Sequence, residues 1–193
     1  MSGRAYTVFD TAIGRCGIAW GQTGIVGVQL PEFREIETRK RLFHLYPDAR
    51  ETRPDPNVED AIEGIVAVLR GEASDLSAVT LDMTGIHPFS QRVYQITRQI
   101  PRGETLTYDD IARKMGASGA VVRPVAQAIA RNPFVVIVPC HRVLEQGGYA
   151  DTISPHGGLI SKRRLLSIDG VSTSTSKTLL DVLLPVAPPR PSN

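Results

Sequence analysis

Two side chains capable of nucleophilic chemistry stand next to each other in the segment Pro139-Cys140-His141-Arg142-Val143. A cysteine thiol has an ordinary pKa near ~8.5, so it needs a base or a positive neighbour to form thiolate at neutral pH. Histidine is a common base, but neighbours on an extended chain point in opposite directions, so adjacency does not guarantee contact, although a water could bridge the two groups. A free cysteine is also often a small buried hydrophobe. The pair alone leaves both interpretations open, nucleophile or core residue.

The elements around this pair indicate how it would be positioned. Residues 134–138 are apolar, β-branched and too short for a helix, which predicts a buried strand leading into the pair. Upstream, residues 107–115 and 122–131 have helical patterns and flank a glycine-containing turn at 116–119, which is typical of a helix-turn-helix. Residues 159–168 predict a last helix. Most helix pairs of this kind only pack together, so DNA binding is one of two interpretations.

The first part of the chain predicts a small sheet with helices. Short β-type runs separated by glycine fill residues 6–28, which is typical of an antiparallel meander. Residues 34–45 are charged and permit a helix that stops before Pro47. Asn57 is a candidate cap for a second helix, and residues 78–81 predict a returning strand. The second helix has one apolar stripe, made by Ile62, Ile65, Val66 and Leu69.

The change in sequence pattern near Pro88 predicts two domains. We place their boundary at residue 86, because helix follows helix from there on. The expected units are a supporting domain at 1–86, a DNA-binding and active-site domain at 87–170, and a flexible tail at 171–193 that is rich in Ser, Thr and Pro.

Composition argues against several classes of protein. The chain is 41% hydrophobic and 22% charged, and no stretch approaches the ~20 apolar residues of a membrane helix. The start MSGRAYTVFD lacks the pattern of a secretory signal, so we expect a cytoplasmic protein without membrane contact. Cys16 and Cys140 cannot form a disulfide framework, and neither a CxxC or CxxH spacing nor a glycine-rich phosphate loop is present. We therefore expect neither a metal nor a cofactor.

Charge divides the chain unevenly. Residues 1–90 carry 9 Lys and Arg against 13 Asp and Glu, whereas residues 91–193 carry 13 against 7, so the formal charges are −4 and +6. A basic half beside an acidic half is typical of a nucleic-acid binder with a supporting domain. A chance distribution of surface charge explains the asymmetry equally well, so charge alone does not decide.

Longer motifs around the pair carry a family resemblance. PCHRV is preceded by RNPFVVIV and followed by GGL, KRRLL and DG, and FSQRVYQITRQIPRGETLTYDDIA lies upstream. With the weaker TAIGRCGIAW near the start, this ordered set resembles the O6-alkylguanine-DNA alkyltransferases over residues 5–170. The resemblance implies an α+β fold: a small N-terminal antiparallel-sheet domain of ribonuclease-H-like type, then a helical domain with a winged-helix-like helix-turn-helix.

The resemblance also implies the activity. An O6-alkylguanine flipped out of double-stranded DNA would give its alkyl group to Cys140, with O4-alkylthymine as a second candidate lesion. The thioether product cannot be hydrolysed, so each molecule would act once. His141 would be the base acting through a water, and Asp169 falls where the family usually has a glutamate that orients this histidine. Tyr108 would contact the flipped base and donate a proton to it. The expected state is a monomer without an obligate protein partner.

The DNA contacts follow from the same resemblance. Arg123 would enter the duplex from the second helix of the helix-turn-helix, and Asn132 would join that helix to the active-site turn. The main-chain carbonyl of Val143 would recognise the guanine edge. Further DNA or base contacts are expected from Thr107, Ser154 and His156.

Three departures from the family pattern keep alternatives open. Pro124 and Ala126 follow Arg123, and proline fits only if the helix begins about there. The loop after PCHRV is longer than is usual in the family, and residues 154–156 replace the usual pair of an aromatic and a small residue. Tyr94 stands where tryptophan is common.

The first alternative function is a damage sensor that binds O6-alkylguanine without accepting the alkyl group. The second is an unrelated Cys-His hydrolase, although no histidine outside the pair lies in a recognisable motif.

Overall fold

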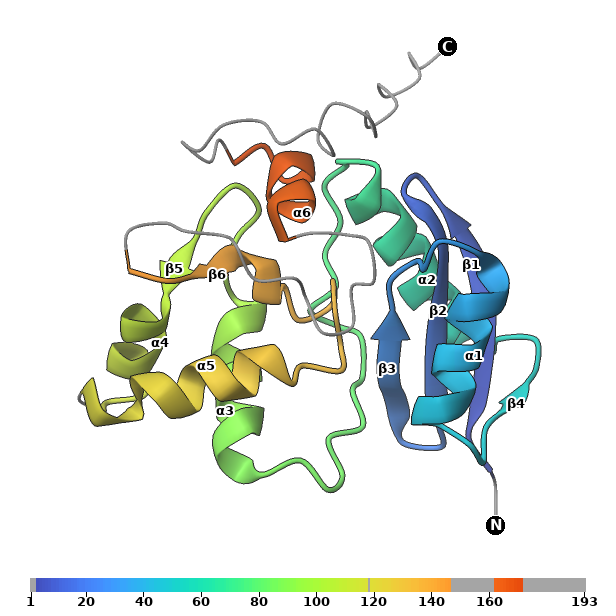
Figure 1. Ribbon diagram of the computed structural model, residues 1–193, viewed down its shortest axis with the longest axis horizontal. Helices are drawn as coiled ribbons and strands as arrows, with labels where there is room; N and C mark the ends of the chain where they lie inside the picture. The colour runs from blue at the N-terminus through green and yellow to red at the C-terminus, as the bar shows by residue number, and fades with distance from the viewer. Residues whose placement is uncertain (1–2, 118, 147–161, 172–193) are drawn as a thin grey trace.

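The computed structural model describes residues 3–117, 119–146 and 162–171, and its fold is α+β (Figure 1). A four-stranded sheet with the helices α1 and α2 lies on one side of the molecule, and a group of further helices lies on the other. One hydrophobic cluster runs through both sides, from Ile18 in the sheet to Val125 and Leu165 among the helices. Within the described ranges, no helix is long and apolar enough to cross a membrane.

The sheet contains the predicted antiparallel meander. Three strands pair in sequence and a fourth adds a short parallel edge, in the order β3-β2-β1-β4. Glycine makes the two tight reversals possible, because Gly14 and Gly24 have φ values of 122° and 139°, which other residues rarely adopt. The strands are β1 (Ala5–Thr11), β2 (Gly14–Gly21), β3 (Gly24–Gln29) and β4 (Arg50–Glu51).

Two helices cover this sheet. α1 (Glu35–Leu45) ends where predicted, and its Leu42 packs on β2 at Gly17, where a side chain would collide with it. The consecutive residues 16–20 of β2 are all buried, which indicates that both faces of the strand are covered.

The second helix, α2 (Pro56–Leu69), differs in detail from the prediction. Asp55 caps it, accepting from Val58 N at 3.1 Å, whereas the candidate cap Asn57 lies inside the helix. Because Pro56 occupies the first helical position, the cap must precede it. In the predicted stripe only Ile65 and Leu69 are buried, and the rest of the buried face is formed by Val58, Ala61 and Val68.

Residues 78–81 do not form the predicted strand. Leu81 makes a single bridge to Ile25, flanked by hydrogen bonds from Ile25 N to Thr80 O (3.0 Å) and from Asp82 N to Ile25 O (2.8 Å). The segment therefore touches the edge of β3 at one point and continues as a loop towards the helical part.

The helix-turn-helix is present as predicted. α4 (Tyr108–Lys114) is followed by a turn, the 3-10 helix η1 (Gly119–Val121) and α5 (Val122–Ala130). Thr107 and Asp110 form a capping box, in which Thr107 Oγ1 accepts from Asp110 N at 3.1 Å and Asp110 Oδ2 accepts from Thr107 N at 2.7 Å. The start of α4 is therefore fixed.

The remaining elements join the helical part to the cysteine. α3 (Pro88–Arg98) packs on α4 and α5, and the 3-10 helix η2 (Cys140–Arg142) touches α6 (Lys162–Ile168). β5 (Leu106–Thr107) and β6 (Val143–Leu144) pair in parallel, which brings the start of α4 beside the end of η2. The first residues of the predicted last helix, 159–161, lie outside the described part of the chain.

Candidate active site

The segment at residues 134–138 is a buried turn and not the predicted strand. Phe134 makes an isolated bridge to Val28 in β3, and the chain then reverses through a hydrogen bond from Val138 N to Phe134 O at 2.7 Å. Val136 has a φ of 75°, in the left-handed region that a β-branched residue rarely adopts. Hydrophobic pattern alone cannot separate a short buried strand from a buried turn, which explains the wrong prediction.

Asn132 lies between the end of α5 and this turn. Its side-chain nitrogen donates to Val138 O at 2.9 Å, and its Oδ1 accepts from Phe134 N at 2.9 Å. The residue is 1% exposed, so both bonds are shielded from water. Asn132 thus fixes the two ends of the turn that leads to Cys140.

Cys140 is the first residue of η2 and is buried. Burial raises the pKa of its thiol above the ordinary value, while a hydrogen bond with the Asn132 side chain and the positive charge of Lys162 oppose that rise in part. At neutral pH the sulfur is therefore protonated. A base must accept the proton before or during nucleophilic attack.

His141 is placed to be that base through its contact with Asp169. Its Nε2 lies 2.9 Å from Asp169 Oδ2, and the two side chains are 3% and 1% exposed. Burial would raise the pKa of Asp169, but hydrogen bonds from His141 and Arg142 outweigh it and hold this pKa well below its usual range. An ionised carboxylate only accepts hydrogen bonds, so we assign the imidazole proton to Nε2.

This tautomer leaves Nδ1 of His141 as the basic nitrogen. Nδ1 is buried and has no hydrogen-bond partner among the residues that the structure describes. Burial also lowers the pKa of His141, although Asp169 opposes the shift, so the ring is neutral at neutral pH. A neutral imidazole with a free Nδ1, on the residue that follows the protonated thiol, can serve as the acceptor of its proton.

Arg142 holds the carboxylate of this pair. Its Nε and Nη2 donate to Asp169 Oδ2 and Oδ1 at 2.6 and 3.1 Å, and its Nη1 donates to Ile100 O at 2.8 Å. A two-pronged contact of this kind fixes the plane of a carboxylate as well as its position. Arg142 had no predicted role, although its place in the PCHRV motif was a signal.

Lys162 is a further residue that sequence reasoning missed. It is only 6% exposed, its ammonium donates to the carbonyl oxygen of Val143, and it lies 5.8 Å from the centre of the Tyr108 ring. The same carbonyl was expected to recognise the guanine edge, so Lys162 occupies it in this structure. A lysine three residues before Leu165, on the side of the helix that carries its leucines, was the signal that could have revealed it.

The residues expected to contact DNA are distributed over the helix-turn-helix. Tyr108 begins α4 and is partly buried, which raises the pKa of its hydroxyl and keeps it protonated. Arg123 lies near the start of α5 and is exposed. Pro124 follows it within the first turn, where a backbone donor is not needed, so the helix accommodates the proline. Ser154 and His156 lie outside the described residues.

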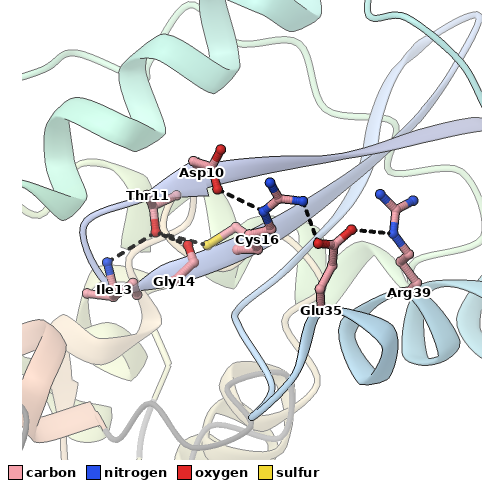
Figure 2. Close-up of polar contacts among 8 residues, drawn as sticks. Asp10, Thr11, Ile13, Gly14, Cys16, Glu35 and Arg39 are labelled. Atoms are coloured by element: carbon pink, nitrogen blue, oxygen red, sulfur yellow. Dashed lines mark hydrogen bonds and ion pairs between the residues drawn. The ribbon is translucent and has the colours of Figure 1, made fainter.

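The second cysteine has different surroundings (Figure 2). Cys16 is fully buried in β2, and its sulfur lies 3.7 Å from the hydroxyl of Thr11. Burial raises the pKa of this thiol to about 12. Across the described ranges, no three His, Cys, Asp or Glu side chains gather as potential metal ligands, around either cysteine or elsewhere.

Comparison with known proteins identifies the family. A family model described as the DNA-binding domain of 6-O-methylguanine DNA methyltransferase matches residues 88–171. A methylated-DNA–protein-cysteine methyltransferase of Methanothermobacter thermautotrophicus is 33% identical over 156 residues, which is 81% of this chain and 80% of the relative. The chain belongs to the methylated-DNA–protein-cysteine methyltransferase family. A member from Mycobacterium leprae is 42% identical over 122 residues, which is 63% of this chain and 71% of the relative.

Solved structures of this methyltransferase family have the same fold. A Mycobacterium tuberculosis OGT in complex with DNA superposes with a TM-score of 0.66 at 30% identity, covering 86% of this chain and 92% of that one. The O6-methylguanine-DNA methyltransferase of Pyrococcus kodakaraensis superposes with a TM-score of 0.62 at 27% identity, covering 87% and 99%. The expected α+β fold, with its N-terminal sheet and helical C-terminal part, is confirmed.

Proposed function

We propose that this protein repairs DNA by moving an alkyl group from O6 of guanine to Sγ of Cys140, once per molecule. The observation that carries the proposal is the buried set Cys140, His141 and Asp169, in which the carboxylate fixes Nε2–H and leaves Nδ1 to act as base. The curated relatives are named as methylated-DNA–protein-cysteine methyltransferases, which supports this interpretation of the site.

The transfer is a substitution at the alkyl carbon. The proton of the Cys140 thiol passes to Nδ1 of His141, directly or through a water, and the sulfur lone pair forms the new S–C bond while the C–O6 bond breaks. The electron pair of that bond stays on the guanine, which the Tyr108 hydroxyl neutralises by donating a proton. The thioether on Cys140 has no hydrolytic exit, so the molecule is consumed.

DNA binding is assigned to the helix-turn-helix. Arg123 on α5 is near the start of its helix, where it can fill the gap left by a flipped nucleotide. Thr107 and Tyr108 at the start of α4 are assigned to the same DNA-facing surface, and Val143 offers its carbonyl to the guanine edge once Lys162 moves. The solved complex of the Mycobacterium tuberculosis relative with DNA supports this partner.

The finer assignments complete the proposal. Residues 87–170 form the DNA-binding and active-site unit and residues 1–86 support it. Asn132 positions the active-site turn, and Ser154 and His156 are assigned as further contacts to the DNA or the base. The protein acts as a monomer on O6-alkylguanine in double-stranded DNA, with O4-alkylthymine as a further lesion to test. The presence of the acceptor thiol argues against the alternative of a damage sensor without transfer.

The decisive experiment follows a labelled methyl group. Duplex DNA carrying O6-[³H-methyl]guanine is incubated with the wild-type protein, with Cys140→Ser and with Cys16→Ser as the matched control. We expect one label per wild-type molecule, the same for Cys16→Ser, and none for Cys140→Ser, with the label found on the Cys140 peptide. Label on Cys140→Ser, or unlabelled wild-type protein that still binds the lesion tightly, contradicts the proposal.

A further inference from the structure

Asp169 reaches His141 from the end of a short helix. It directly follows α6, and Gly170 next to it has a φ of 81°, which closes the helix with a hydrogen bond from Val171 N to Leu166 O at 2.9 Å. An aspartate has only one methylene group, so its carboxylate follows the position of its backbone closely. Whatever fixes the end of α6 therefore also fixes the partner of His141.

Arg102 binds this helix end. Its Nη2 donates to the carbonyl oxygen of Ile168, the last residue of α6, at 3.0 Å, and its Nε lies 4.0 Å from Asp169 Oδ1. Carbonyls in the last turn of a helix lack an intrahelical donor, and a cation is favourable there. The Arg102 side chain is 37% exposed and the ion pair is long, so the hydrogen bond to Ile168 is the stronger contact.

The same guanidinium also meets the N-terminal part of the molecule. Gly71, just beyond α2, has a φ of 81°, and a Cβ at that position would lie 3.4 Å from both Arg102 Nη2 and Ile168 O. A separation of 3.4 Å is an ordinary van der Waals distance, so Gly71 lies beside the contact between Arg102 and Ile168 without blocking it. Arg102 itself lies in the loop between α3 and β5, so it brings together three segments that are distant in sequence.

Arg102 and Arg142 hold Asp169 in different ways. Arg142 donates hydrogen bonds to both carboxylate oxygens of Asp169, whereas Arg102 donates to the backbone carbonyl of the preceding residue, Ile168. Rotation of the carboxylate is thus limited by one arginine and displacement of its backbone by the other. The second restraint matters most for a short side chain.

We propose that Arg102 is a positioning residue for the alkyl transfer: it holds the end of α6 so that Asp169 keeps the proton on Nε2 of His141. This inference rests on the proposed function, because Arg102 acts only through the base that serves Cys140. The inference adds to the proposed function a structural link, made by Arg102, between the N-terminal part of the molecule and the pair of His141 and Asp169.

A DNA-free measurement tests the inference independently of repair. The rate at which iodoacetamide alkylates Cys140 is followed from pH 6 to 10 by mass spectrometry of its peptide, in wild type and in Arg102→Leu. We expect the rate at pH 7 to fall about tenfold in Arg102→Leu, because a less well oriented base assists less. The pH profile should also move to higher pH.

Arg98→Leu is the matched control. Arg98 Nη2 donates to three loop carbonyls, Leu76 O, Ser77 O and Val79 O, at 2.6, 3.1 and 2.9 Å, whereas Arg102 donates to the end of α6. We expect its melting temperature to fall at least as far as that of Arg102→Leu, with the Cys140 profile unchanged. Equal profiles for Arg102→Leu and wild type would overturn the inference.

Rescue separates positioning from general stability. In Arg102→Leu, the further change Asp169→Glu gives the carboxylate one more methylene, so it reaches His141 without the helix end being held. The alkylation rate should return to within about threefold of wild type while the melting temperature stays low. Failure of this rescue would overturn the inference. If wild-type protein takes no label from O6-methylguanine but Arg102→Leu still shifts the profile, the proposed function fails and the positioning role stands.

Discussion

The two cysteines of this chain occupy regions that differ in what surrounds a buried thiol. Cys16 in β2 is 0% exposed and Cys140 at the start of η2 is 7% exposed, and burial raises the pKa of both. At Cys16 only the hydroxyl of Thr11 opposes that rise (Figure 2), whereas at Cys140 Asn132 and Lys162 do. Burial makes both thiols poor acids, and their neighbours decide which one can react.

The same contrast holds for buried charge. Among the described residues, the buried acids and bases, apart from the two thiols and the phenol of Tyr94, are His141, Lys162 and Asp169, and all three belong to the Cys140 site. Around Cys16 the ion pairs of Arg15 with Asp10 and Glu35 lie at the surface, where such pairs contribute little (Figure 2). Burying charge is costly unless it is paired, so its concentration at one cysteine marks a site built for chemistry.

The largest expected difference between the regions comes from the carboxylates. Asp169→Asn should lower the alkyl-transfer rate at pH 7 about 100-fold, because an amide can stabilise the wrong imidazole tautomer and cannot balance a charged ring. Asp10→Asn, in the ion pair near Cys16, should leave the rate unchanged. Single-turnover transfer from methylated DNA measures both. Similar rates for the two variants would erase the distinction between the regions.

Removal of the buried ammonium tests the electrostatic part of the contrast. Lys162→Met should raise the pKa of Cys140 further, since the positive charge lowers it, and should slow Cys140 alkylation about tenfold at pH 7. The deficit should shrink as the pH rises and both proteins form thiolate. Arg15→Met, which removes an exposed cation near Cys16, serves as the control and should leave both thiols unaffected. A deficit that is constant with pH would argue against a charge effect.

The two regions should also limit stability at opposite ends of the pH range. The pKa of His141 is lowered on folding, so the unfolded chain binds that proton more readily and stability falls as the pH drops below 6.5. The pKa of Cys16 is raised from 9.0 to about 12, so its contribution is complete below pH 9 and is lost as the pH rises towards 12.

Measuring the free energy of unfolding with denaturant at acid, neutral and alkaline pH tests both directions. His141→Gln should flatten the acid limb and leave the alkaline one. Cys16→Ala should flatten the alkaline limb, by up to about 4 kcal/mol for a shift of about three pKa units. Because Tyr46 and Tyr94 also have pKa values raised to about 12, and the pKa of Cys140 is raised too, part of the alkaline limb should survive in Cys16→Ala. If His141→Gln flattened the alkaline limb and Cys16→Ala the acid limb, the directions of the two pKa shifts would be contradicted.

The smallest expected effects come from two glycines that end helices. Gly170 and Gly116 have φ values of 81° and 73°, and a Cβ added at either position would meet no neighbouring atom within 4 Å, so alanine adds only backbone strain. Each change to alanine should cost about 1 kcal/mol of unfolding free energy. Only Gly170→Ala, next to Asp169, should also slow alkyl transfer. An equal slowing in Gly116→Ala would indicate a general loss of stability.

Much of the fold could be predicted from local pattern. The meander followed from short β-type runs separated by glycine, and the helix-turn-helix followed from two helical patterns around a glycine turn. Both depend on neighbours within a few residues. The strands predicted at 78–81 and 134–138 were wrong. An apolar run indicates that a segment is buried, but a strand also needs a pairing partner, which the sequence does not specify.

The residues of the site also divide into those that the sequence predicted and those that it missed. Cys140 and His141 came from one motif, and the resemblance supplied Asp169, whose contact with His141 the structure contains. Arg142 and Arg102 were missed because their bonds span 27 and 66 residues. Tyr94, expected only as a packing change, donates from its hydroxyl to Ala128 O at 2.9 Å, a bond that depends on how α3 meets α5.

The contact between β3 and the active-site turn bears on how the protein can be divided. Val28 N donates to Pro133 O at 2.8 Å, and Val28 bridges Phe134, which is fully buried. A fragment that begins after the sheet would expose Phe134 and leave the Pro133 carbonyl to water, within a few residues of the reactive sulfur. Cutting the chain near residue 86 would thus remove the contacts that support the turn leading to Cys140, so fragment and fusion designs should keep the sheet.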